Sequence, residues 1–193
     1  MLALHAIIKW LARASAAVGG IVLTLLIILT TLSIIGRTIS KAANGEVLSS
    51  AAAWFAAWVN RVGIDEINGT YELTEAGVAF AIFSFFPICQ FYGAHATVDV
   101  FTSALPDRMN RILRAFWEIV LTATLIFITF RLYDGMLRYL KNGETTLFLQ
   151  FPVWWGYGAS LGAAIIACVV GVYCAAVRVG EMTSGRSVLP QGE

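Results

Sequence analysis

The sequence has few charged residues. Asp, Glu, Lys and Arg make up 13% of its 193 residues, and the formal net charge is +1. A soluble domain usually carries about 25% charged residues, which cover its water-facing surface. This chain has about half that share of charged residues, too few to cover the surface of a soluble domain. Its near-neutral charge also excludes strong electrostatic recruitment of nucleic acid, so we expect no nucleic-acid partner.

Residues that commonly bind metals and redox cofactors are rare as well. The chain has two histidines, His5 and His95, and three cysteines, Cys89, Cys168 and Cys174. The cysteines lie inside apolar runs and form no CxxC pair, so neither a disulfide framework nor a thiol redox site is indicated. A zinc site needs several converging ligands, and no catalytic signature such as GxSxG or a P-loop occurs. We predict a protein that is not an enzyme, with no catalytic, metal or substrate-binding residues and no cofactor of its own.

Apolar residues, by contrast, make up 59% of the chain. They gather in four runs, at residues 14–36, 76–94, 112–130 and 153–177. Each run is close to the roughly 20 residues that a helix needs to cross a bilayer core, and none has the polar face of a helix in a soluble bundle. The first run is longer than the h-region of a cleaved signal peptide, about 7–15 residues. We therefore predict an all-α integral membrane protein with four transmembrane helices in a single membrane domain, residues 1–193.

Two segments outside these runs also have a helical pattern. Near the N-terminus four apolar residues recur at helical spacing: Leu4, Ile7, Ile8 and Leu11. This spacing predicts an amphipathic helix on the membrane surface that runs into span one, and a span that starts early and tilts explains it equally well. Residues 47–62 carry Trp54 and Trp58, and Trp favours the membrane–water boundary. That segment predicts an interfacial helix between spans one and two, in contact with lipid or with a partner protein.

Only one ionisable residue lies well inside a span. Glu118 is in the third run, and Arg114 lies one turn before it, where an i,i+4 ion pair can form. An intramembrane carboxylate costs roughly 2.5–3.5 kcal/mol on insertion scales and is a functional candidate by default. We interpret it as an intramembrane ion pair with Arg114. In span four, Gly158 and Gly162 form a GxxxG motif, which favours close helix packing within the chain or with a partner.

Several short motifs follow one another in a recognisable order. Acidic residues precede span two, a His-x-x-Val-Asp segment follows it, a Leu-Pro and a basic residue precede span three, and a Pro-x-Trp begins span four. The residues that carry these motifs are Glu72, Glu75, His95, Asp99, Pro106, Arg108 and Pro152. In order and spacing they resemble the small, Q-type membrane subunit of tripartite ATP-independent periplasmic (TRAP) transporters. Two features depart from that family: its acidic pair is often adjacent, and residues 47–62 form a longer insert than expected.

The resemblance implies a role in transport. In this family a periplasmic binding protein captures an organic anion, and a large membrane subunit carries it together with coupling ions, typically sodium. The small subunit is similar to a scaffold that braces the large one. The resemblance therefore implies a non-catalytic subunit of a secondary symporter, with the large subunit, the binding protein and membrane lipid as partners. Coupling sodium is expected in the large subunit only.

The family also implies the bacterial inner membrane. Basic residues favour the cytoplasmic side of short connections, and Arg108, Arg111 and Arg114 cluster beside span three. This cluster predicts that both termini are cytoplasmic. An alternative function is a self-assembling four-span protein such as a small channel, for which Thr24, Thr31 and Ser33 would supply a thin polar face on span one.

Overall fold

The computed structural model describes residues 2–45, 53–63, 65, 67–93 and 107–184. Within these ranges the chain forms the helices α1 (Leu2–Ala43), α3 (Ala53–Val62), α4 (Thr70–Tyr92), α6 (Asp107–Asn142) and α7 (Trp154–Ser184). The described residues contain no β-strand, apart from an isolated antiparallel bridge between Thr145 and Pro152.

The four apolar runs are helices, as predicted. Helices α1, α4, α6 and α7 are each long and apolar enough to cross a membrane, so the prediction of an all-α membrane protein with four spans is confirmed. The helices extend beyond the runs. Helix α6 has 36 residues and contains the run at 112–130 with charged turns at both ends. Those turns stay helical because their long side chains can reach water or headgroups while the backbone keeps its internal hydrogen bonds.

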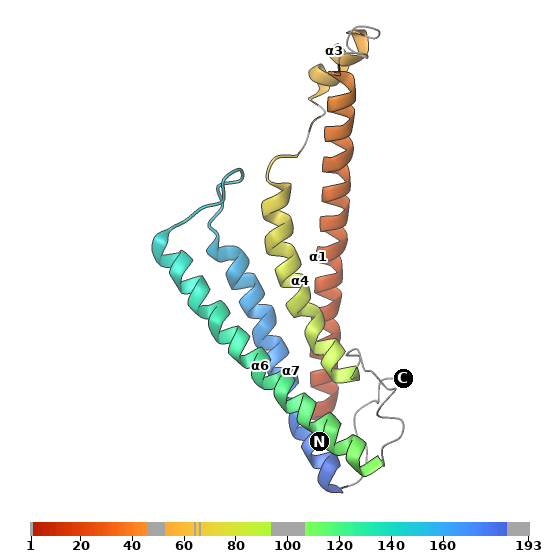
Figure 1. The fold of residues 1–193 in the computed structure, drawn as a ribbon, viewed down its shortest axis with the longest axis vertical. Helices are drawn as coiled ribbons and strands as arrows, with labels where there is room; N and C mark the ends of the chain where they lie inside the picture. The colour runs from red at the N-terminus through yellow and green to blue at the C-terminus, as the bar shows by residue number, and fades with distance from the viewer. Residues whose placement is uncertain (1, 46–52, 64, 66, 94–106, 185–193) are drawn as a thin grey trace.

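Helix α1 is a single helix of 42 residues. The N-terminal segment with the amphipathic pattern is helical, as predicted, and continues without a break into span one. At 1.5 Å per residue α1 is about 63 Å long, roughly twice the thickness of a bilayer core. Figure 1 shows α1 extending well past the other helices, with α3 at its far end. Only part of α1 can therefore lie in the bilayer core.

Helix α3 is the helix predicted between spans one and two. The first part of the predicted segment, residues 47–52, lies outside the described residues. Trp54 and Trp58 are exposed on α3. The side-chain amides of Asn60 on α3 and Asn44 just after α1 hydrogen-bond to each other at 3.1 and 3.3 Å. One face of α3 is thus tied to the end of α1, and its tryptophan rings lie on the surface.

The four long helices lie side by side in the order α1, α4, α7, α6 (Figure 1). Successive long helices along the chain run in opposite directions, so the spatial neighbours α4 and α7 are parallel to each other. The start of α1 and the end of α7 therefore lie at one end of the molecule, here called the terminal end. The connection from α6 to α7 lies at the opposite end, here called the hairpin end. With α1 and α6 at opposite edges, the helices form an open layer toward the hairpin end, whereas near the terminal end α1 also contacts α7 and α4 is hydrogen-bonded to α6.

The helices converge toward the terminal end, where the apolar core lies (Figure 1). Ile8 and Ala12 of α1 pack there with Phe91 of α4 and with Val170 and Cys174 of α7. From this core the layer widens toward the hairpin end (Figure 1). Neighbouring helices still contact each other there, at Gly156 and Ala76 between α7 and α4 and at Gly135 and Tyr157 between α6 and α7.

Candidate functional site

The connection from α6 to α7, residues 143–153, is a short hairpin. The Thr146 N–H donates to the Phe151 carbonyl at 3.0 Å, and the Val153 N–H donates to the Glu144 carbonyl at 3.0 Å. These two backbone hydrogen bonds fix the hairpin at its base and leave the backbone N–H groups at its tip free for another partner.

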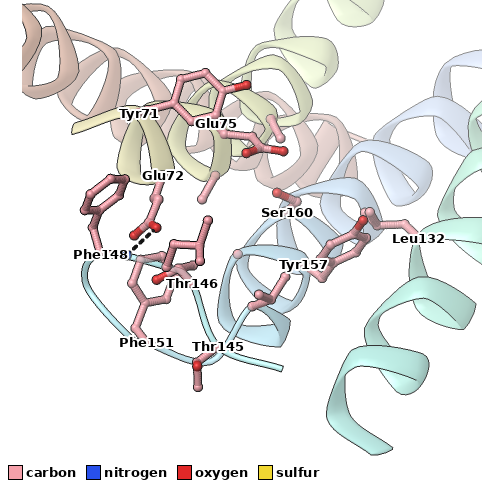
Figure 2. A pocket seen from close by; sticks show the side chains of 15 residues that line it. Tyr71, Glu72, Glu75, Leu132, Thr145, Thr146, Phe148, Phe151, Tyr157 and Ser160 are labelled. Atoms are coloured by element: carbon pink, nitrogen blue, oxygen red, sulfur yellow. Dashed lines mark hydrogen bonds between the residues drawn. The ribbon is translucent and has the colours of Figure 1, made fainter. Parts of the chain in front are cut away.

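Glu72, in the first turn of α4, supplies that partner. Its carboxylate accepts the Phe148 N–H at 2.8 Å and the Leu149 N–H at 3.1 Å (Figure 2). Hydrogen bonds to an ionised acceptor are stronger than neutral ones. Leu149 also covers Gly69, which precedes α4 with φ +82°, so that any side chain at Gly69 would be strained and would collide with Leu149. Glu72 therefore joins α4 to a segment 76 and 77 residues further along the chain.

A cavity of about 480 Å³ lies beside the hairpin. The hairpin, α4 and α7 form most of its wall, and the polar side chains on that wall include Glu75, Tyr157 and Ser160. Figure 2 shows the carboxylate of Glu75 directed from α4 toward α7, where Ser160 lies. Ser160 is only 2% exposed, and its Oγ has no hydrogen-bond partner among the residues that the structure describes. Among the described residues, the lining includes the carboxylates of Glu72 and Glu75 but no Lys, Arg or His. The cavity thus offers acceptor oxygens and negative charge.

Three of the seven motif residues meet at this cavity or the adjoining hairpin. Glu72 and Glu75 lie on α4, and Pro152 pairs with Thr145 across the hairpin just before α7 begins. Arg108 lies far from them, exposed in the first turn of α6 at the terminal end. The remaining motif residues lie outside the described residues: His95, Asp99 and Pro106.

A second polar group lies inside the helix layer, in the half nearer the terminal end. Gln90 of α4 is fully buried, and its Nε2 donates to Thr122 Oγ1 on α6 at 2.9 Å. Gly171 of α7 leaves room for this amide, because a Cβ there would lie 2.9 Å from its oxygen. Arg178 and Glu181 of α7 form an ion pair at 3.0 Å, and both side chains are buried. This group links three helices inside the membrane-spanning part of the chain.

Glu118 belongs to this buried group. Its side chain is buried. The amide of Gln90 and the guanidinium of Arg178 both stabilise the negative charge of its carboxylate. Arg114 is exposed, and no Arg114–Glu118 ion pair forms between these two described side chains. The structure thus corrects the predicted pair, because α6 turns Glu118 into the layer and Arg114 away from it. The signal that could have found the true partner was the polar Gln90 inside span two, since a buried amide needs a hydrogen-bond partner.

The GxxxG glycines of span four make no close helix contact within the described residues. A Cβ at Gly158 would lie 3.7 Å from Met136 Sδ, an ordinary contact, and a Cβ at Gly162 would meet nothing within 4 Å. Close approaches of α4 to α7 occur at Gly171, described above, and at Gly156, where a Cβ would lie 3.0 Å from Ala76 of α4. Gly162 therefore leaves an open position on the surface of α7.

Neither polar group resembles a metal centre. Among the described residues, no three His, Cys, Asp or Glu side chains gather closely enough to hold a metal ion. The buried group can brace α4, α6 and α7 against one another. The cavity can bind a group that carries hydrogen-bond donors or positive charge.

Comparison with known proteins places the chain in a family. No curated protein and no solved structure matches it. Residues 26–180 match the family model described as tripartite ATP-independent periplasmic transporters, DctQ component. The match covers most of the chain and includes all four apolar runs in whole or in part. The resemblance found in the sequence motifs is thereby confirmed, and the chain belongs to the DctQ family, the small membrane component of TRAP transporters.

Proposed function

We propose that this chain is a non-catalytic scaffold that braces the large membrane subunit of a TRAP transporter. The complex would take up an organic anion, delivered by a periplasmic binding protein, together with coupling ions. The observation that carries the proposal is the family match over residues 26–180. The match names the component, and the arrangement of helices and polar groups supports the bracing role.

The open layer of helices supports a partner within the membrane. A helix layer leaves two broad faces that only lipid or another membrane protein can cover. Span one is the most open, with large apolar side chains such as Ile21, Ile28 and Leu32 exposed. A rigid layer of this kind can lie along a larger protein and hold it in place while that protein moves.

The internal polar groups support a transport path in another chain. Gln90, Thr122 and Glu118 face one another between helices, and Arg178 pairs with Glu181 on α7. Each therefore contributes to packing of this chain, whereas a solute path needs polar groups that face a water-filled passage. We place the coupling sodium in the large subunit for the same reason.

We further propose the bacterial inner membrane, with both termini in the cytoplasm. The terminal end of α6 carries Arg108, Arg111 and Arg114, and such clusters favour the cytoplasmic side. The hairpin end would then face the periplasm, as would α3 with its exposed Trp54 and Trp58. That end is where the periplasmic binding protein would approach.

The polar side chains of span one do not favour the channel alternative. The Thr24 hydroxyl donates to the Gly20 carbonyl at 2.8 Å, and the Thr31 hydroxyl donates to the Ile27 carbonyl at 2.7 Å. Ser33 Oγ accepts the Ile67 N–H at 3.1 Å. All three hydroxyls that would line a pore are thus engaged within the chain.

Co-purification tests the proposed function. The chain, carrying an affinity tag, is expressed with the reading frames that neighbour its gene. We expect a much larger multispan protein to copurify with it in equal amounts and to remain bound through size-exclusion chromatography. Isolation as a solitary homo-oligomer that conducts ions in liposomes would contradict the scaffold role and support the channel.

A further inference from the structure

The Glu72 side of the cavity holds the hairpin on α4, whereas Glu75 and Ser160 on its wall have no hydrogen-bond partner among the described residues. We propose that this cavity receives the primary ammonium group of a lysine side chain from the large membrane subunit. This inference rests on the proposed function, because it names the site at which the two subunits engage. Three observations carry it: an unpartnered buried hydroxyl, an unneutralised carboxylate and the apolar surroundings of the cavity.

The buried hydroxyl is that of Ser160. A buried polar atom without a hydrogen-bond partner costs about 1–3 kcal/mol in a folded protein, and such atoms need an explanation. Ser160 lies on the wall of a cavity large enough for a ligand, and within the described chain its Oγ is unpartnered while its residue is 2% exposed. A donor group placed in the cavity would satisfy it.

The charge of the cavity selects a cation. Glu72 is engaged by the hairpin N–H groups, whereas no hydrogen bond or ion pair engages Glu75 within the part of the chain that the structure describes. Tyr157 packs against Tyr139 of α6 with ring centroids 4.9 Å apart, and neither Tyr139 nor the neighbouring Arg138 belongs to the cavity lining. The lining therefore keeps a net negative charge that is open to an incoming positive group.

The geometry favours an ammonium over a guanidinium. An ammonium group has three donors around one compact charge, whereas a guanidinium is planar and binds best to two parallel oxygens. The acceptors here are two separate oxygen groups on two helices, the Glu75 carboxylate and the Ser160 hydroxyl, whereas the Tyr157 ring packs against Tyr139 of α6. A lysine also brings an apolar stem, which the aromatic wall of Phe148 and Phe151 can cover.

The surroundings favour the large membrane subunit as the source. Leu147 and Phe148 at the hairpin tip are 86% and 67% exposed, and permanent interfaces are more apolar than transient ones with soluble proteins. An aminophospholipid also carries a primary amine. However, its phosphate would have to approach a lining that, in the part of the chain the structure describes, carries two carboxylates and no basic side chain.

A zero-length cross-link tests the proposal in the purified complex with the large subunit. A water-soluble carbodiimide activates a carboxylate, which an adjacent amine attacks. An amide bond forms between them, and the carboxyl oxygen leaves with the carbodiimide as a urea. We expect mass spectrometry to find Glu75 joined to one lysine of the large subunit. Glu75→Gln should abolish the product, and Glu144→Gln should keep it, because Glu144 is exposed on the same hairpin and bonds to Asn142.

Dissociation of the complex supplies the second measurement. Glu75→Gln should speed subunit dissociation about tenfold or more, as when one partner of an interfacial charge pair is truncated, and Ser160→Ala should speed it less. Exchanging the two charges, Glu75→Lys with the cross-linked lysine changed to Glu, should restore slow dissociation. Glu144→Gln should leave the rate unchanged.

The outcomes separate the proposal from its alternatives. A product with the mass of an aminophospholipid would overturn the protein source. Faster dissociation of Glu75→Gln without any cross-link would overturn the primary amine, because a guanidinium forms no such amide. If the complex still copurifies but shows neither the cross-link nor the faster dissociation, the cavity inference is overturned and the proposed function stands. Failure of the complex to form would overturn the proposed function, and this inference with it.

Discussion

At the scale of single residues, Gly171 determines whether Gln90 can occupy the interior of the helix layer. A Cβ at Gly171 would lie 2.9 Å from Oε1 and 3.0 Å from Nε2 of that amide. The amide is fully buried and bonded to Thr122, so it has no free space into which it can move. We expect Gly171→Ala to break this hydrogen bond and lower the free energy of unfolding by about 1–3 kcal/mol. Reversible unfolding by SDS in mixed micelles measures the change.

Gly162→Ala is the matched control on the same helix. A Cβ at Gly162 would meet nothing within 4 Å, and alanine is favoured over glycine inside a helix by about 1 kcal/mol. This variant should therefore unfold at the same or slightly higher SDS fraction. If Gly171→Ala and Gly162→Ala lowered the free energy of unfolding equally, the space that Gly171 leaves for Gln90 could not be the cause.

Individual site residues could be read from the sequence, but their partners could not. Glu72, Glu75 and Pro152 stand out by motif, and all three lie at the hairpin end. Arg114 and Glu118 have the i,i+4 spacing at which helical side chains can form an ion pair, but this pair does not form between the two described side chains. The spacing shows which side chains can meet, whereas the packing of α7 against α6 determines which of them turns inward.

At the scale of elements, the hairpin at 143–153 depends on Glu72. We expect Glu72→Ala to leave the helices intact while the amide protons of Phe148 and Leu149 exchange faster, because both lose their acceptor. Hydrogen–deuterium exchange with mass spectrometry reports this peptide directly. The remaining peptides of α6 and α7 should exchange at the wild-type rate.

Glu75→Ala serves as the comparison for the hairpin. It lies one turn further along α4, and no hydrogen bond joins it to the hairpin among the described residues. Its hairpin peptide should exchange as in the wild type. If Glu72→Ala and Glu75→Ala had the same effect, general negative charge rather than the two specific hydrogen bonds would hold the hairpin.

The last turns of α7 carry a buried ion pair whose loss should be costly. Arg178→Met removes the positive charge that pairs with the buried carboxylate of Glu181 and acts on that of Glu118, and removing one partner of a buried pair costs about 3–5 kcal/mol. Arg131→Met is the matched control, because Arg131 and Asp134 form an exposed pair of the same i,i+3 spacing at 3.8 Å. An exposed pair contributes about 0–1 kcal/mol. SDS unfolding measures the loss of unfolding free energy in each variant. Equal losses would contradict the prediction that the buried pair contributes more than the exposed one.

The existence of these elements was predictable, and their lengths were not. Apolar runs identify the part of a helix that lies in hydrocarbon, which is why the four spans were found. Helix α1 continues to Ala43 and α6 to Asn142, because a helix ends where its backbone finds other partners rather than where its apolar residues end. The hairpin contact with Glu72 was hidden for a related reason: its donors are backbone N–H groups, which leave no mark in the sequence.

At the scale of the whole molecule, the order α1, α4, α7, α6 gives a layer with its two termini at one end. Because both termini lie at one end, the orientation of the whole chain in the membrane can be measured by labelling either end of the layer. Arg108 and Lys141 are exposed near opposite ends of the same helix, α6. Whichever side of the membrane Arg108 faces, Lys141 must face the other.

Cysteine labelling in intact spheroplasts decides between the two orientations. An impermeant maleimide should react with Lys141→Cys from outside, whereas Arg108→Cys should react only after the membrane is broken, because the arginine cluster at that end favours the cytoplasm. Background from the native thiols should be small, since Cys174 is buried and Cys89 and Cys168 are partly buried inside spans. The reverse pattern would place the hairpin end and its cavity in the cytoplasm. A periplasmic binding protein could then not reach that end, although the lysine contact with the large subunit would remain open to test.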